Sequence, residues 1–339
     1  MSRGYNIAVV GATGAVGREM LKILEERNFP IRNLRAIASE RSEGKTLKFA
    51  QEKIKVENLG SSSSFKGIEI ALFSAGAPIS KEFSPKMVKA GAVVVDNSKA
   101  FRMEEEVPLI VPEVNPQSVR NHKGIIANPN CSTIQLVVAI NPIHKSAHIN
   151  RLNVSTYQAV SGTGKEAIEE LKRQVEQCIK GEKITRQVYP HQIAFNLLPH
   201  IGDFLSNGYT EEEMKLVNET RKIMEDESIT ITATCVRVPV FISHSEAVNL
   251  QTERKITPLQ VKNILLNAPG VILEDKSEEN IYPLPLKTAG RDEVFVGRIR
   301  EDFSTNKGIN LWIVADNLRK GAALNTIQIA ELLIKENLI

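Results

Sequence analysis

The chain has 339 residues, of which 42% are hydrophobic, 24% charged and 5% aromatic, and its net charge at pH 7 is +3. This length predicts two domains rather than one small core. The small charge, with basic and acidic residues mixed along the helices, argues against nucleic acid or a membrane surface as a partner. No apolar run approaches the ~18 residues that would span a bilayer.

The cysteines Cys131, Cys178 and Cys235 are odd in number and far apart, without a CxxC or Cys/His metal spacing. The N-terminal stretch "MSRGYNIAVVGATG" leads directly into a strand and leaves no room for a signal or transit peptide. We therefore expect a reduced, cytoplasmic protein. His144 and His148 have the spacing of a metal pair, but the sequence places no acid or third ligand near them, so no metal site is expected.

The first third of the chain alternates short apolar runs with helical patterns. A helix is expected over 16–28, and strands are expected at 5–12, 33–39, 68–75, 92–97 and 108–114. Strands that alternate with helices predict a parallel sheet with right-handed crossovers, as in a Rossmann-type α/β domain.

After Ile143 the apolar runs become longer and often alternate polar with apolar residues, as half-exposed antiparallel strands do. We expect strands at 151–160, 228–240, 246–254, 293–302 and 309–318, and helices at about 164–180 and 211–226. The pattern predicts a mixed α+β second domain. The amphipathic segment 321–339 is predicted to be a helix that returns to the first domain. The expected division is 1–130 with 319–339 for nucleotide binding, and 131–318 for catalysis and dimerisation.

Gly11, Gly14 and Gly17 form a G-x-x-G-x-x-G motif between the first strand and the first helix. Glycines in this context allow a tight turn and close approach of the backbone to a pyrophosphate, which the helix N-terminus attracts. Glycines at strand–helix turns also occur for packing reasons alone. The strand before and the helix after favour a dinucleotide site.

The predicted second strand ends at Ser39, and Glu40, Arg41 and Ser42 follow. An NAD site usually ends this strand in an acid that binds the ribose 2′-hydroxyl. Arg41 with hydroxyls beside it suits a 2′-phosphate and favours NADP. Glu40 could still bind a ribose, and Arg41 could be a solvated loop charge. The stretch "SGTGKE" at 161–166 lacks the glycine spacing and the Ser or Thr of a phosphate loop, so a kinase or ATPase is not indicated.

Cys131 follows Asn130, a good N-cap residue, and opens an apolar helix that Pro142 is expected to end. A thiol in the first helical turn lies at the positive end of the helix dipole, which favours the thiolate. The alternative is a buried structural cysteine. A thiolate beside a nicotinamide suggests that the thiol adds to an aldehyde, hydride leaves and a thioester remains. Cys178 and Cys235 are interpreted as structural.

Three further positions could serve such chemistry. Arg237 falls on the apolar face of its predicted strand, where it needs a carboxylate or phosphate partner, which could also be a protein acid. His244 is expected in a turn, either as a general base or simply solvated. The helix that begins at "TEEEMK" shows a capping box of Thr210 and Glu213. Glu212, Lys215, Glu219 and Lys222 follow at helical spacing on one polar face, and on this evidence alone they form a surface ladder of ion pairs.

Several stretches together closely resemble the bacterial aspartate-β-semialdehyde dehydrogenase family. They are "GATGAVG" at 11–17, "DNSKAFRM" at 96–103, "NPNCST" at 128–133, "YQAVSGTG" at 157–164, "EEMK" at 212–215, "CVRVPVFISHSE" at 235–246 and "DNLRKGAALN" at 316–325. Their order matches the family throughout, and the similarity covers essentially the full length.

The resemblance implies roles that the residues alone do not establish. Cys131 would be the nucleophile, His244 the general base or acid, and Gln158 the group that orients the acyl oxygen. Arg237 and Glu212 would bind the substrate carboxylate and amino group, with Asn130 beside the substrate. Arg102 and Lys215 would hold phosphate. The residues implied in NADP binding are Gly11, Thr13, Gly14, Ala15, Val16, Ser39, Arg41, Ser42, Ser74, Ser161, Gly162 and Asn317.

The implied reaction is the reversible, NADP- and phosphate-dependent oxidation of L-aspartate 4-semialdehyde to L-4-aspartyl phosphate, which serves the biosynthesis of lysine, threonine, methionine and diaminopimelate. The family also implies a homodimer, with a tetramer as the alternative. Two rival functions remain. One is the related N-acetyl-γ-glutamyl-phosphate reductase, whose acetylated substrate needs no acid such as Glu212. The other is a regulatory protein that binds a nucleotide without turnover.

Overall fold

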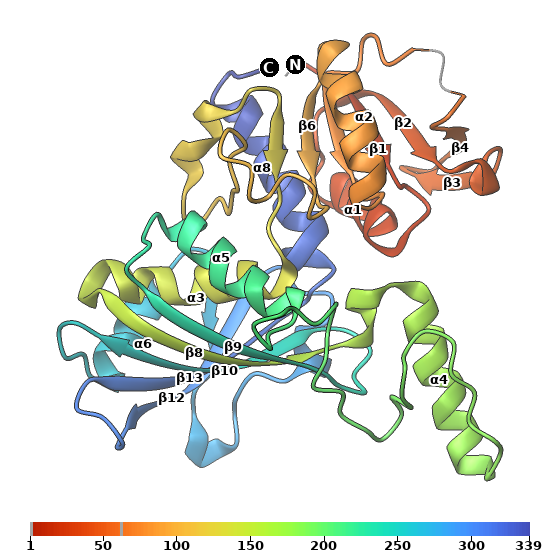
Figure 1. Ribbon diagram of the computed structural model, residues 1–339. Coiled ribbons are helices and arrows are strands. Elements are labelled where there is room, and N and C mark those ends of the chain that lie inside the picture. The colour runs from red at the N-terminus through yellow and green to blue at the C-terminus, as the bar shows by residue number, and fades with distance from the viewer. Residues whose placement is uncertain (1–2, 62–63) are drawn as a thin grey trace. The chain divides into compact units, whose positions relative to one another are not determined.

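The computed structural model describes residues 3–61 and 64–339. These residues form two compact units, residues 1–130 with 322–339 (unit 1) and residues 131–321 (unit 2). Each unit has its own sheet (Figure 1). No helix in the described part of the chain is long and apolar enough to cross a membrane.

Unit 1 contains a seven-stranded sheet in the order β3-β4-β2-β1-β5-β6-β7. All neighbours are parallel except β3 and β4. The strands are β1 (Tyr5–Val10), β2 (Ile31–Ala38), β3 (Thr46–Phe49), β4 (Glu52–Asn58), β5 (Ile70–Phe73), β6 (Val93–Asp96) and β7 (Ile125–Ala127). Because β1 is flanked by β2 on one side and β5 on the other, the strand order reverses beside β1. Ligands of such sheets bind at the carboxyl ends of the strands at this reversal.

Both faces of the unit 1 sheet are covered, which explains why its strands are apolar throughout. Ile7 and Val9 face the core cluster that includes α1 (Ala15–Glu26) and α8 (Leu324–Lys335). Ala8 and Val10 face the cluster with α2 (Ala77–Lys89). The expected return of the C-terminal helix to the first domain is confirmed, since α8 packs against α1 and β6.

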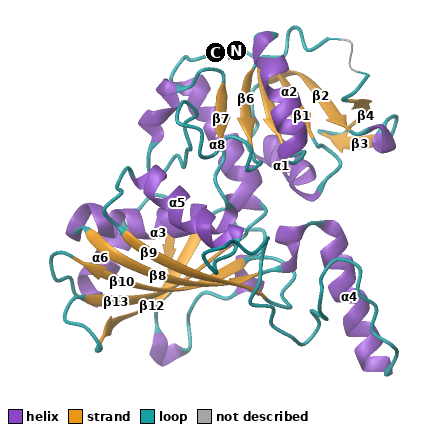
Figure 2. Ribbon diagram, in the orientation of Figure 1, coloured by secondary structure: helices purple, strands orange, loops and turns teal. Residues whose placement is uncertain are grey.

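Unit 2 contains a mixed six-stranded sheet in the order β11-β12-β13-β10-β8-β9. Its strands are β8 (Ile149–Gln158), β9 (Thr230–Arg237), β10 (His244–Thr252), β11 (Val271–Leu273), β12 (Val294–Asp302) and β13 (Gly308–Ala315). Its helices are α3 (Cys131–Ala147), α4 (Lys165–Lys180), α5 (Glu211–Met224), α6 (Pro258–Leu266) and the short α7 (Pro285–Thr288). Figure 2 shows α3, α5 and α6 gathered against the sheet.

Three local expectations were wrong. Residues 108–114 form no strand; Leu109 makes a single bridge to Ala127, and the Val111 N–H donates to the Asn115 side chain. The apolar run there reflects burial, and prolines on either side interrupt any ladder. Pro142 does not end α3, which continues to Ala147. His144 and His148 also meet an acid after all, Asp226.

Candidate active site

Unit 1 has a cavity of about 400 Å³ at the carboxyl ends of β1, β2 and β5. Its lining includes Gly11, Thr13, Gly14, Ser39, Arg41 and Ser74, all of which were expected at the nucleotide. Ala15, Val16 and Ser42 do not line this cavity, although the Ser42 hydroxyl lies 3.3 Å from that of Thr13. Leu59, Ile79 and Phe83 add an apolar wall that the sequence pattern did not indicate.

Gly11 cannot be replaced without displacing the backbone at Ser74, which also lines this cavity. Its φ is +86°, and a Cβ there would lie 2.5 Å from the Ser74 carbonyl oxygen. A Cβ on Gly17 would lie 2.2 Å from the Gly11 carbonyl oxygen, so this glycine lets helix α1 approach the turn. The N-cap of α1 is Gly14, which has no side chain to accept the first helical N–H groups. Gly11, Ala12 and Gly14 use their own N–H groups in backbone hydrogen bonds, so the N–H groups that can face an anion are those of the first turn of α1, as a pyrophosphate site requires.

In unit 2, Cys131 is the first residue of α3 and is partly exposed. All three cysteines are thiols and not disulfides. Gly321, in the short π-helical turn Arg319–Ala323, packs against the nucleophile candidate: a Cβ on it would lie 2.9 Å from the Cβ of Cys131. Sequence reasoning missed Gly321, because a glycine whose φ is ordinary shows its purpose only through its neighbours.

His244 is not in a solvated turn but is the first residue of β10, and it is completely buried. Its Nδ1 accepts a hydrogen bond from the Ala159 N–H at 3.0 Å, while its Nε2 has no partner among the described residues. Burial lowers the pKa of His244 to about 3, with the charge of Arg237 acting in the same direction and that of Glu212 opposing it. The ring is therefore neutral, and its proton sits on Nε2.

Arg237, the last residue of β9, is 5% exposed. Its Nη1 donates to the Ala159 carbonyl at 2.7 Å, but its Nε has no partner in the described part of the chain. No described carboxylate forms an ion pair with this guanidinium, so the protein-acid alternative for Arg237 finds no support. A buried guanidinium with an unsatisfied N–H favours an anionic ligand.

Gly162 belongs to the turn Val160–Thr163 and lies directly against the side chains of Arg237 and His244. A Cβ on Gly162 would lie 3.0 Å from Arg237 Nη1 and 3.1 Å from His244 Nε2. Next to it, the Ser161 hydroxyl donates to Asn317 Oδ1 at 3.0 Å, and the same oxygen accepts the Ser243 N–H at 3.0 Å. Ser161, Gly162 and Asn317, all expected at the cofactor, thus meet beside His244.

Gln158 ends β8 opposite Arg237 on β9. Its carboxamide is held at both ends: Thr156 donates to its Oε1 at 3.0 Å, and its Nε2 donates to Glu212 at 3.1 Å. Lys215 pairs with the other oxygen of Glu212 at 3.0 Å. Glu212 is 6% exposed, so the surface-ladder interpretation of this helix face was wrong. The capping box of Thr210 and Glu213 is confirmed.

Arg102 and Asn130 belong to unit 1 and are both buried. Arg102 donates from Nε to the Asn128 carbonyl at 2.9 Å and from Nη2 to the Asn97 carbonyl at 2.8 Å. These bonds hold the guanidinium beside Asn97, which follows β6, and beside Asn128, which precedes Cys131 closely in the sequence. Cys235 lies inside β9, where burial strongly raises the pKa of its thiol, which agrees with a structural role.

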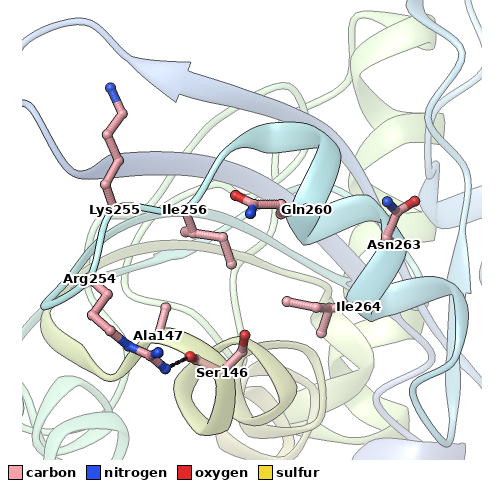
Figure 3. Close-up of a pocket in the computed structure, with 8 residues that line it drawn as sticks. All are labelled: Ser146, Ala147, Arg254, Lys255, Ile256, Gln260, Asn263 and Ile264. Carbon is pink, nitrogen blue, oxygen red and sulfur yellow. Dashed lines mark hydrogen bonds between the residues drawn. The ribbon is translucent and has the colours of Figure 1, made fainter.

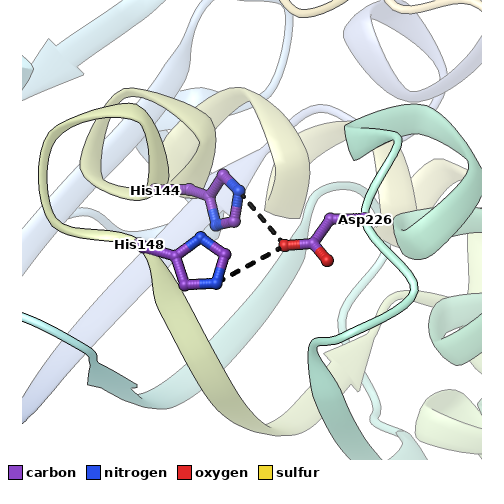
Figure 4. A group of neighbouring side chains, drawn as sticks. All are labelled: His144, His148 and Asp226. Atoms are coloured by element: carbon purple, nitrogen blue, oxygen red, sulfur yellow. Dashed lines mark ion pairs between the residues drawn. The ribbon is translucent and has the colours of Figure 1, made fainter.

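His144, His148 and Asp226 form a separate cluster at the far end of α3 (Figure 4). The Nε2 atoms of His144 and His148 lie 3.5 and 3.8 Å from Asp226 Oδ2. His144 Nδ1, however, accepts the Ile149 N–H at 3.1 Å. A histidine that binds metal through Nε2 carries its proton on Nδ1 and donates it. The observed bond therefore argues against His144 as a metal ligand.

A second cavity, of about 370 Å³, lies between the end of α3 and the start of α6 (Figure 3). In it the Arg254 guanidinium donates to the Ser146 carbonyl. With a rise of about 1.5 Å per residue, this end of α3 is roughly 24 Å from Cys131. The cavity is therefore separate from the candidate catalytic residues.

Comparison with known proteins agrees with this arrangement. The family described as "Semialdehyde dehydrogenase, NAD binding domain" matches residues 6–122, and "Semialdehyde dehydrogenase, dimerisation domain" matches residues 140–320. The fold and site thus define a semialdehyde dehydrogenase: an oxidoreductase that binds a nicotinamide cofactor and forms oligomers.

More specific relatives were found over the full length. The chain is 58% identical to an aspartate-semialdehyde dehydrogenase of Aquifex aeolicus, covering 99% of this chain and 100% of the relative. A structure of aspartate semialdehyde dehydrogenase II from Vibrio cholerae complexed with ASA is 48% identical, with a TM-score of 0.96 over 98% of this chain and 99% of that one. A Candida albicans aspartate semialdehyde dehydrogenase with NADP is 26% identical, with a TM-score of 0.77 over 99% and 100%. The chain belongs to the aspartate-semialdehyde dehydrogenase family.

Proposed function

We propose that the chain catalyses the reversible, NADP- and phosphate-dependent conversion of L-aspartate 4-semialdehyde to L-4-aspartyl phosphate through a thioester on Cys131. The reaction serves the biosynthesis of lysine, threonine and methionine in the cytoplasm, and the working form is a homodimer. The observation that carries the proposal is the pair in unit 2 of a buried neutral imidazole, His244, with an unpartnered N–H among the described residues, and a buried arginine, Arg237, without a protein acid, which both lie against Gly162. The thiol of Cys131 opens a helix of the same unit.

The unit 1 cavity suits a dinucleotide, because it lies at the carboxyl ends of β1, β2 and β5, beside the glycine turn that opens α1. Arg41 and Ser39 line the cavity and suit a 2′-phosphate, which favours NADP over NAD. Leu59, Ile79 and Phe83 offer an apolar wall for an aromatic base. When bound, NADP supplies the acceptor for the hydride.

Cys131 begins the reaction as a thiolate, which its place at the start of α3 favours. Its sulfur forms a bond to the aldehyde carbon, and the electron pair of the carbonyl bond moves onto the oxygen. The adduct is an alkoxide that has gained no proton. Arg237 binds the α-carboxylate of the substrate, Glu212 binds its amino group, and Gln158 orients the reacting oxygen. Asn130 completes the substrate contacts.

His244 stabilises this alkoxide by donating its Nε2–H. The resemblance implied a general base or acid. An imidazole whose Nδ1 accepts the Ala159 N–H has a proton to donate at Nε2 and no lone pair there to take one, which favours the donor role. No general base is needed, because an alkoxide can release hydride directly and leave a thioester. An N–H aimed at the developing charge is the usual means of stabilising an oxyanion.

Phosphate then cleaves the thioester. One of its oxygens attacks the acyl carbon, the tetrahedral oxyanion is stabilised by the same N–H, and the carbon–sulfur bond breaks to return the thiolate. Lys215 and Arg102 hold the phosphate, as two cations suit a doubly charged anion. The product is the acyl phosphate.

The assay that tests the proposal is NADPH formation from aspartate semialdehyde, with and without phosphate. NAD and N-acetylglutamate semialdehyde serve as comparison substrates. Strong activity that requires phosphate supports the thioester route. Activity on the acetylated aldehyde alone would indicate an N-acetyl-γ-glutamyl-phosphate reductase. No activity with any combination of aldehyde and cofactor would favour a non-catalytic nucleotide-binding protein. The buried Glu212 beside Gln158 supports a substrate with a free amino group.

The role of His244 has its own test. His244→Gln keeps an N–H donor, whereas His244→Ala removes it. A donor role predicts that Gln retains at least about tenfold more kcat than Ala, the worth of one charge-assisted hydrogen bond. Equal loss in both variants, together with an acid limb in the wild-type pH profile near pH 6.5, would restore the general base.

A further inference from the structure

Helix α4 carries a stripe of polar side chains that is not exposed. Glu170, Gln174 and Gln177 are spaced by four and three residues and therefore share one face of the helix. Glu170 and Gln174 are completely buried. Polar groups at such positions need partners, because unpaired burial costs free energy.

The partners belong to residues 181–209, a long segment between α4 and α5 without a helix or strand (Figure 1). The Glu170 carboxylate accepts the backbone N–H groups of Gln187, Val188 and Tyr189 at 2.6, 2.8 and 3.3 Å.

Further along the same face, Gln174 Oε1 accepts the N–H groups of Ile193 and Ala194, and its Nε2 donates to the Thr185 carbonyl. Gln177 accepts the Thr185 N–H. The side chains of α4 thus satisfy backbone N–H and C=O groups of the segment, as a neighbouring strand would in a sheet. Segments this long without regular structure are uncommon in compact domains and are usually functional.

The segment leads to the proposed substrate site at two points. The Tyr189 hydroxyl donates to Thr163 Oγ1 at 2.9 Å. Thr163 ends the 3-10 turn Val160–Thr163, whose Gly162 lies against Arg237 and His244. Further along, Leu198 exchanges two backbone hydrogen bonds with Arg237, at 2.8 and 3.0 Å.

Tyr189 also lies within the electrostatic reach of the arginine. Burial raises the pKa of the Tyr189 hydroxyl, while the charge of Arg237 and the bond to Thr163 oppose this shift. Since the net effect raises the pKa, the hydroxyl keeps its proton and remains a donor to Thr163. The satellite core of Val160, Leu171 and Leu198 packs beneath this contact.

We propose that Glu170 and Tyr189 are positioning residues for substrate binding: Glu170 orders residues 187–189, and Tyr189 in turn braces the turn Val160–Thr163, against which the Arg237 guanidinium lies. The inference rests on the proposed function, because it assigns to Arg237 the carboxylate of the aldehyde substrate. It predicts that disturbing residues 187–189 weakens aldehyde binding more than it weakens NADP binding.

The first test is Tyr189→Phe, which removes the hydroxyl and keeps the ring. We expect the KM for aspartate semialdehyde to rise about 3- to 10-fold, the loss expected for one hydrogen bond, with kcat within about twofold of the wild type and a smaller rise in the KM for NADP. The matched control is Tyr209→Phe. Tyr209 makes an equivalent bond to Thr232, at 2.8 Å, within the same unit. This control should lose similar stability and keep its KM. Equal KM in the two variants would overturn the proposal.

The second test is Glu170→Gln, with Glu170→Asp as the conservative variant that keeps the charge. Hydrogen exchange of the N–H groups at 187–189 should speed up in Glu170→Gln and partly recover in Glu170→Asp, a readout that does not depend on turnover. Faster exchange with an unchanged aldehyde KM would refute the positioning role. If the wild type fails to oxidise aspartate semialdehyde, the proposed function fails, whereas the exchange result still tests the ordering by Glu170.

Discussion

The two units hold their ligand sites in contrasting ways. In unit 1 the cavity is built around one contiguous turn, where Gly11, Thr13 and Gly14 follow β1 directly. In unit 2 the candidate catalytic residues come from α3, β8, α5, β9 and β10, which are far apart in the chain. A local site needs a particular backbone conformation, whereas a scattered site needs particular neighbours.

Glycines illustrate the difference. Gly11 is required by its backbone, since its φ of +86° lies in the left-handed region and its approach to Ser74 is close. Gly162 and Gly321 have no such φ and are required by the side chains beside them, Arg237 with His244 and Cys131, respectively. The sequence motif reveals the first kind of glycine but not the second.

The largest expected effect comes from the nucleophile of the scattered site. Cys131→Ala should lower kcat by at least about 10⁴-fold, as removal of a covalent nucleophile does, without changing cofactor affinity. Steady-state kinetics and NADP binding by fluorescence would measure both. The control is Cys178→Ala on α4, which should keep its activity. Normal turnover by Cys131→Ala would refute the thioester route.

Next in size is the local site. Gly11→Ala combines a strained φ with a clash and should weaken NADP binding by about 10- to 100-fold, the equivalent of 1–3 kcal/mol. Gly91→Ala is the matched control, because Gly91 also has a left-handed φ, +102°, but has no atom within 4 Å of its virtual Cβ. If both variants bind NADP equally well, the crowding at Ser74 does not matter.

A smaller effect is expected at Gly321, which leaves space for the side chain of Cys131. Gly321→Ala should displace Cys131 and reduce both kcat and the rate of thiol alkylation by about 10-fold, because misplacement of a reacting group by a fraction of an ångström is costly. Calorimetric NADP affinity should stay unchanged, in contrast with Gly11→Ala. Loss of cofactor binding together with activity would show that the two sites are not separable in this way.

The smallest effect concerns stability and pH. Burial raises the pKa of Glu246 well above its usual value, with the nearby Gln135 offsetting only part of the cost. The native state therefore holds a proton that the unfolded chain releases above pH ~4.5, so stability falls as pH rises. His244 acts oppositely: the unfolded chain protonates below pH ~6.5 while the native ring stays neutral to about pH 3, so stability falls as pH drops through this window.

Glu246→Gln removes the ionisable carboxyl group and with it the loss of stability as pH rises. Urea unfolding at pH 8 should show the variant more stable than the wild type by about 1–4 kcal/mol, with little difference at pH 4, where both states of the wild type are protonated. A variant that is equally destabilised at both pH values would mean that Glu246 is ionised in the native protein.

Local pattern was sufficient for much of this protein. The spacing of apolar residues and the glycines between segments predicted β1, α1, β2, β5 and β6, the mixed second sheet and the returning α8. These elements follow from short-range conformational preferences and, in the first sheet, from burial of both faces. The same reasoning failed at 108–114 and at Pro142, where buried apolar residues imitate a strand and a helix tolerates its proline. The place of Cys131 at a helix start was also readable from Asn130 and the apolar run after it.

Tertiary structure alone decided the state of the catalytic groups. Whether His244 is solvated or buried, and which nitrogen carries its proton, depends on the Ala159 N–H from another strand end. That Glu212 is buried beside Gln158, that Arg237 lacks a protein acid, and that Gly321 lies against Cys131 all involve residues far apart in the chain. The sequence by itself determined most of the elements and the nucleotide turn, because these depend mainly on neighbours along the chain. Protonation, burial and close contact depend on neighbours in space, and only the folded unit supplies them.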